Sequence, residues 1–232
     1  AGRPFFVCYG STVRSKDSPS GRTFADEARR RQLVECAIEV IADEGFAKAS
    51  LSRIAQRAGV AKSVVLYHFA NKDELVSHVL TAVSEASLEF VVPRAQAATT
   101  AWEGLRGSIE AVVDYIATHP KHALAGLETW NQTRSLPARA QLARDRGPGA
   151  IEQALVDGQR SGEFTDFDPH VMAVMVTQAI DAIVLEAALD PDLDVPAFGA
   201  ELVAMFDRAI RRPNDQRGTH ESSLDHRGGI AR

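Results

Sequence analysis

The sequence predicts an all-α protein in which a small N-terminal helical unit is followed by a larger helical domain. Three observations support this prediction: apolar residues recur at helical spacing through the middle of the chain, glycines and prolines separate these stretches, and no alternating strand pattern of useful length occurs. The 232 residues include 45% hydrophobic and 25% charged residues, which is ordinary for folded globular domains.

The N-terminal unit is predicted from three short helical patterns. The first has an apolar stripe (Leu33, Ala37, Ile38, Ile41, Ala42) and ends at Gly45. Ser50 is positioned as the N-cap of a second helix, and Gly59 ends that helix. The third helical pattern ends near residue 70. Asn71 and Glu74 then form the pattern of a capping box, which predicts the start of a longer helix. Pro93 is expected to limit that longer helix.

Five further helices are predicted beyond Pro93, each bounded by proline or glycine, over residues 102–118, 121–134, 148–161, 169–189 and 196–211. We therefore divide the chain into a flexible extension (1–22), a helix-turn-helix domain (23–71), a larger helical domain (72–212) and a flexible tail (213–232). The apolar stretch 171–189 contains Thr177, Gln178, Asp181 and Glu186, so it is interpreted as a buried helix rather than a membrane span.

The two cysteines, Cys8 and Cys36, lack the spacing of a disulfide framework or a zinc site. We expect no metal, no cofactor, no secretion signal and no membrane partner, and we predict a cytoplasmic protein.

Charge is distributed unevenly along the chain. The formal net charge is -5, yet residues 45–72 contain no Asp or Glu, and five cations lie there: Lys48, Arg53, Arg57, Lys62 and Lys72. Two short helices joined by a glycine turn lie in the same window. In a helix-turn-helix the second helix enters the major groove of DNA, so charge and geometry both predict nucleic-acid binding here.

The stretch AGVAKSVVLYHFANKDEL (residues 58–75), together with Gly45, Phe46, Ile54 and Ala55, resembles the DNA-binding signature of the TetR family of transcriptional regulators. The resemblance implies a homodimer that binds double-stranded operator DNA and is released from it by a small-molecule effector. It also implies phosphate contacts from Lys62, Tyr67, His68 and Lys72 and base contacts around Ser63 and Val64. With Ser50, these form the predicted DNA-binding set.

Two positions depart from the family pattern. Ala61 replaces the usual serine cap of the recognition helix, and Leu66 replaces a tyrosine, which removes a potential phosphate contact. Leu66 and Phe69 are expected in the core or in an interface. Ser63 and Val64 are compatible with apolar contact to thymine methyl groups.

The C-terminal domain offers weaker signals. Aromatic, Met and polar residues of the kind that line bundle pockets are the predicted effector-binding residues: Tyr115, Trp130, Asn131, Met175 and Gln178. Surplus apolar faces on the last two helices predict a four-helix dimer interface, and its predicted members are Met175, Ile183, Val203 and Phe206.

Two other functions stay open at this point. An all-helical enzyme is disfavoured because no nucleophile elbow, Glu-x-x-His pair or phosphate-binding glycine loop occurs. A DNA-binding architectural protein without an effector would differ in that no small molecule changes its DNA affinity.

Overall fold

The computed structural model describes residues 24–133 and 148–211, and within these ranges the secondary structure is helical apart from one isolated β-bridge between Phe164 and Arg211. The helices are α1 (Phe24–Glu44), the 3₁₀ helix η1 (Phe46–Lys48), α2 (Leu51–Arg57), α3 (Lys62–His68), α4 (Lys72–Ala97), α5 (Ala101–Thr118), α6 (Pro120–Gln132), α8 (Pro148–Arg160), α9 (Pro169–Leu189) and α10 (Val195–Ile210). The all-α prediction is confirmed. The predicted tails, 1–22 and 213–232, lie outside the described residues.

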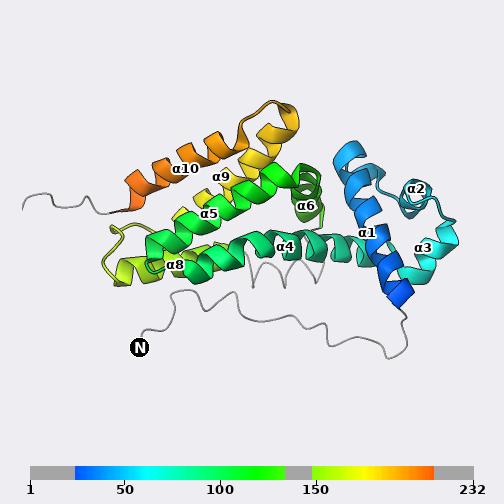
Figure 1. The fold of residues 1–232 in the computed structure, drawn as a ribbon, viewed down its shortest axis with the longest axis horizontal. Coiled ribbons are helices and arrows are strands. Elements are labelled where there is room, and N and C mark those ends of the chain that lie inside the picture. Colours follow the sequence, from blue (N-terminus) through cyan, green and yellow to red (C-terminus); the bar gives the residue numbers. More distant parts are fainter. Residues whose placement is uncertain (1–23, 134–147, 212–232) are drawn as a thin grey trace, which may run out of the picture.

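The elements form an elongated molecule with two ends (Figure 1). At one end α1, α2 and α3 gather around the start of α4. From there α4 runs along the long axis, with α5, α9 and α10 layered over it and α8 at the opposite end. Helix α6 stands between α1 and the C-terminal helices and packs against both α1 and α4.

Side chains fix where several helices begin. The hydroxyl of Ser50 accepts the N–H of Arg53, as predicted for the cap of α2. Asn71 Oδ1 accepts the N–H of Glu74, and Glu74 Oε2 accepts the N–H of Ala70, which confirms the capping box at α4.

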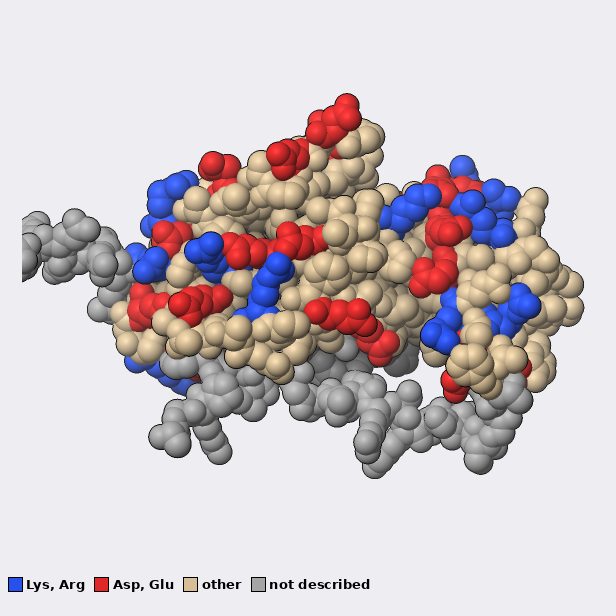
Figure 2. Space-filling model, in the orientation of Figure 1, with Lys and Arg blue, Asp and Glu red and all other residues tan. Residues whose placement is uncertain are grey.

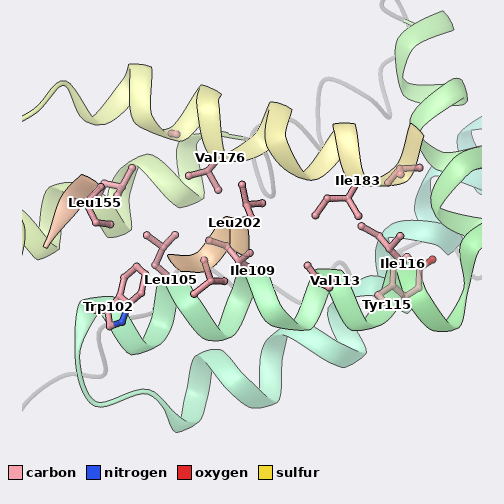
Figure 3. Packing of buried hydrophobic residues seen from close by; sticks show 14 of the residues in the cluster. Trp102, Leu105, Ile109, Val113, Tyr115, Ile116, Leu155, Val176, Ile183 and Leu202 are labelled. Atoms are coloured by element: carbon pink, nitrogen blue, oxygen red, sulfur yellow. The ribbon is translucent and has the colours of Figure 1, made fainter. Parts of the chain in front are cut away.

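Two clusters of buried side chains hold the fold. The N-terminal cluster includes Leu33, Ile38, Ile54, Val65 and Phe69, and the first turns of α4 also belong to it through Leu75 and Val79. The C-terminal cluster joins α5, α8, α9 and α10 (Figure 3), with Leu105, Ile109, Ile116, Leu155, Val176 and Ile183 among its members. Val83, Ala86 and Phe90 of α4 pack against the C-terminal cluster, so α4 contributes to both cores.

Close helix packing depends on two glycines. A methyl group at Gly126 of α6 would lie 2.7 Å from Cγ1 of Val83 on α4, and one at Gly199 of α10 would lie 2.6 Å from Val113 of α5. Only a hydrogen side chain lets these helices approach so closely.

Two expectations about individual helices were wrong. Pro93 does not end α4, which continues to Ala97. Pro93 and Glu89, four residues before it, are both exposed, so water can bond the carbonyl that the proline leaves unpaired. Helix α9, interpreted as a buried helix, is buried on one side only, where Ala173, Val176, Ile183 and Val184 lie.

Candidate nucleic-acid interface

Helix α3 is held with one face inward and one face outward. Val65 is fully buried, and Phe69, which follows the helix, is also fully buried in the N-terminal core. Lys62, Ser63 and Tyr67 are exposed, with Tyr67 at 76%. The outward face therefore presents cationic and hydroxyl groups at the end of the molecule.

Arg30 of α1 fixes the end of α3. Its guanidinium donates to the carbonyl oxygen of His68 and to Glu74 Oε1, the latter at 3.0 Å, and lies 4.3 Å from the centroid of the Phe69 ring. One side chain thus connects α1, α3 and α4. Arg30 was not predicted, because nothing in the sequence distinguishes it from its neighbours Arg29 and Arg31.

Carboxylates from outside the acid-free window 45–72 neutralise part of its positive charge in the folded protein. Arg53 donates to Glu44 at 2.6 Å, and Arg57 pairs with Asp43 and, at 3.4 Å, with Glu39. The hydrogen bonds from Arg53 lower the pKa of the Glu44 carboxyl. Figure 2 shows acidic and basic side chains interleaved over α1.

Lys48 and Lys62 form no ion pair with any residue that the structure describes. They are therefore the cations of the window that are most available to an anionic partner.

Two of the four predicted phosphate-contacting residues lie away from the outward face. The ring of His68 is buried, with 8% of the residue exposed, and meets Tyr67 edge-on at 5.0 Å. Lys72 Nζ donates to the carbonyl oxygen of Phe46 at 3.1 Å and lies 4.3 Å above the Phe46 ring. Burial lowers the pKa of Lys72. The four residues accordingly do not form one exposed cluster, because the core retains His68 and η1 retains Lys72.

Other predicted residues at this end lie as follows. Ser50 is exposed and caps α2, Val64 is half-buried, and Ala61 precedes α3 without a side-chain cap, as expected. Leu66 was expected in the core or in an interface; with 45% of it exposed, it does not lie in the core of this chain.

Helix α6 connects the C-terminal domain to the DNA-binding end through three polar contacts. Lys121 Nζ pairs with Asp43 at 2.8 Å, His122 Nε2 lies 2.9 Å from Glu35 Oε2, and Glu128 Oε2 accepts the N–H of Phe46 at 2.8 Å. The hydrogen bond from Lys121 is the main cause of the lowered pKa of Asp43. None of the three contacts was predicted, since they join residues far apart in the chain.

The predicted effector-binding residues do not converge. Tyr115 is buried in the C-terminal core, donates its hydroxyl to the carbonyl oxygen of Val83 at 3.3 Å and stacks on His119, and burial raises its pKa. Trp130 is half-buried and Asn131 exposed. Met175 and Gln178 are exposed on α9, whereas Tyr115 is buried, so one protomer does not bring these residues together in its interior.

The predicted dimer-interface residues fall into two groups, one buried and one at least partly exposed. Ile183 is fully buried and Val203 is 8% exposed, both within the core of one protomer, so neither is available to a partner. Met175 is 57% exposed and Phe206 is half-buried. The exposed large apolar residues of α9 and α10 are instead Val171, Val174, Met175, Leu185, Leu189, Phe198 and Met205.

Two described helices, α4 and α9, are long and apolar enough to cross a membrane by length and composition alone, and 28% and 22% of their apolar windows are buried. Both pack within the helical bundle, α4 against α5 and α9 against α8.

Comparison with known proteins matches both parts of the chain. The signature described as bacterial regulatory proteins, tetR family, covers residues 33–79, and that of a tetracyclin repressor-like C-terminal domain covers residues 98–185. The HTH-type transcriptional repressor SCO4008 of Streptomyces coelicolor is 30% identical over 165 residues, which are 68% of this chain and 80% of that protein.

Other relatives match over different lengths. The HTH-type transcriptional regulator BetI 1 of Chromohalobacter salexigens is 30% identical over 117 residues, or 50% of this chain, and the match spans 58% of that relative. The crystal structure of AibR in complex with isovaleryl coenzyme A and operator DNA has the same fold, with a TM-score of 0.66 at 22% identity over 76% of this chain and 97% of that one. Since the matches cover both the helix-turn-helix and most of the C-terminal helices, the chain belongs to the tetR family of bacterial regulatory proteins.

Proposed function

We propose that this protein is a cytoplasmic transcriptional repressor that binds operator DNA through α2 and α3 and releases it when a small molecule binds its C-terminal domain. The observation that carries the proposal is the outward face of α3, where Lys62, Ser63 and Tyr67 are exposed on a helix anchored by the core. A short helix presented in this way fits the major groove. The name of SCO4008 as a repressor supports the direction of control.

Lys62 and Tyr67 are the phosphate contacts that we propose for α3, with Lys48 as a further cation from η1. Such contacts hold the protein on the duplex but do not select its sequence. Ser63 lies between them on the exposed face and is proposed to meet base edges.

The effector is proposed to bind beside the inner face of α6. His122 Nδ1 and Thr129 Oγ1 are buried there without a hydrogen-bond partner, and Thr129 is fully buried. His122 and Thr129 are seven residues apart, which is close to two helical turns, so they lie on the same side of α6. An unpaired buried polar group costs about 1–3 kcal/mol, which a polar group of a ligand would offset. That AibR, which has the same fold, is complexed with isovaleryl coenzyme A supports a small-molecule effector.

The route from effector to DNA is proposed to pass through α6 as well as α4. Glu128 directly precedes Thr129 in the chain, and its carboxylate accepts the N–H of Phe46 in η1. A shift of α6 on effector binding would therefore move η1 and the start of α2. Effector and DNA would then each weaken the other's binding by the same factor, since coupling between two binding sites is reciprocal.

We propose a homodimer formed by the outer faces of α9 and α10. Val171, Val174, Met175, Leu185 and Leu189 recur at helical spacing along the exposed side of α9, and Phe198 and Met205 are exposed on α10. Exposed apolar side chains gathered along one face are typical of protein interfaces. The two-fold symmetry of such a dimer would place two α3 helices on one duplex.

Selection of bound fragments from the genomic DNA of the source organism tests the proposal. The full chain should enrich a small set of sites with two-fold symmetry, and footprinting should show protection there. Lys62→Ala should weaken this protection. The matched control is Arg160→Ala, which removes an exposed cation from α8 at the other end of the molecule (Figure 1).

The genes next to the selected sites then indicate which small molecules to test as effectors. Enrichment without any effect of small molecules would favour an architectural protein. Absence of enrichment would overturn the proposal. Turnover of a substrate would instead favour the alternative of an all-helical enzyme.

A further inference from the structure

Leu66 is an exposed leucine on a surface whose other exposed members are polar. It is 45% exposed on α3, whereas Val65 beside it is fully buried. Nearly half of this apolar side chain is therefore open to whatever α3 contacts.

The helical geometry places Leu66 near the centre of the outward face. At about 100° per residue, the exposed residues follow one another around α3 in the order Lys62, Leu66, Ser63, Tyr67, opposite the buried Val65 and His68. Leu66 and Ser63 occupy the middle, while Lys62 and Tyr67 flank them. Val64 lies at the edge, half-buried, so it is less well placed than Leu66 to reach a partner.

We infer that Leu66 is a specificity-determining residue that contacts the 5-methyl group of a thymine in each operator half-site. This inference rests on the proposed function. The leucine side chain has no hydrogen-bonding atom, and the thymine methyl is the one apolar group among the base edges of the major groove. Lys62 and Tyr67, on either side, carry donors suited to the phosphates that border the groove.

The test uses the operator selected by the full chain and a series of duplexes in which single thymines are replaced by deoxyuridine, which pairs identically but lacks the methyl group. We expect replacement at one symmetry-related pair of thymines to weaken binding about 15-fold, or about fourfold per methyl lost from a contact. Leu66→Ala should bind the thymine operator more weakly by a similar factor and show no penalty for deoxyuridine at that pair.

Two variants serve as matched controls. Lys62→Ala should weaken binding to thymine and deoxyuridine duplexes alike and so keep the ratio between them. Val64→Ala should keep that ratio as well. Circular dichroism should show that each variant retains the helical content of the unmodified chain.

Three results would overturn the inference: no thymine position sensitive to the methyl group, a deoxyuridine penalty that persists in Leu66→Ala, or a penalty that disappears in Val64→Ala instead. Failure to select any operator at the first step would overturn the proposed function itself. If the full chain selects an operator but Leu66→Ala does not change the effect of deoxyuridine, this inference alone fails and the proposed function stands.

Discussion

Glu128 of α6 accepts the backbone N–H of Phe46 at 2.8 Å, so a residue of the C-terminal domain holds the turn that precedes the helix-turn-helix. The carbonyl oxygen of the same Phe46 accepts Lys72 Nζ at the start of α4. Phe46 is thus bonded to two helices that extend into the C-terminal domain, and changes on either helix should reach α2 through it.

Replacing Glu128 by alanine should reduce the coupling between effector and DNA. Because α6 would lose its bond to η1, we expect the ratio of operator affinities without and with effector to fall about fivefold or more, since the usual coupling of about 1–3 kcal/mol corresponds to about 5- to 150-fold. Titrations of labelled operator with and without effector measure this ratio. Glu85→Ala, an exposed carboxylate on α4, is the control. An unchanged ratio in Glu128→Ala would exclude this contact from the coupling route.

Gly126→Ala should destabilise the fold by forcing α6 from α4. The added methyl would lie 2.7 Å from Val83 Cγ1, and overpacking of this kind typically costs about 1–3 kcal/mol. Urea denaturation measures the loss. The double variant Gly126→Ala, Val83→Ala should recover part of it, because the second change removes the atom that clashes. If the double variant loses more free energy of unfolding than the sum of the losses in the two single variants, the clash with Val83 does not explain the destabilisation by Gly126→Ala.

Lys62 and Lys72 should behave differently in DNA binding although both were predicted phosphate contacts. Lys62→Ala should make the slope of log affinity against log salt shallower by about 1 per contact, or about 2 for a symmetric dimer. Lys72→Ala should lower the free energy of unfolding by about 1 kcal/mol through loss of the bond to Phe46, with a smaller change in slope.

Isotherms on operator and scrambled duplexes at several salt concentrations decide between these roles. A loss of slope in Lys72→Ala as large as that in Lys62→Ala would restore Lys72 to the set of phosphate contacts.

Met175→Glu combined with Leu185→Glu should yield a folded monomer. Both residues are exposed on α9, at 57% and 49%, so added charge there opposes association without entering the core. Sedimentation velocity at micromolar protein concentration measures the oligomeric state. Charged substitution at Ile183, which is fully buried, should unfold the protomer instead. A dimer that survives the double change would place the interface elsewhere.

His170 should titrate above its ordinary pKa of 6.5, mainly because its ring bonds to Glu152 Oε2 at 2.9 Å. Its raised pKa means that the contact stabilises the fold fully below pH 6.5 and that this stabilisation is lost as pH rises through the raised value. NMR titration should show the midpoint falling toward 6.5 in Glu152→Gln. A midpoint that this substitution leaves unchanged would show that the pair does not persist in solution.

Local patterns in the sequence were enough to predict the helical class and the caps of α2 and α4. Apolar spacing set the helical class, and Ser50, Asn71 and Glu74 are caps because their hydrogen bonds reach only residues three or four positions away. The family signature, which also lies in one continuous stretch, identified the helix-turn-helix and its outward Lys62 and Tyr67.

The tertiary structure alone decided which of these side chains are available to partners. Arg53 and Arg57 read as part of a basic surface, yet carboxylates of α1 pair with them across the fold. Ile183 looked like an interface residue because composition records that a side chain is apolar but not whether the same chain already covers it. The contacts of Glu128 with Phe46 and of His122 with Glu35 join residues more than eighty positions apart, and such pairings exist only once both cores have packed α6 against α1.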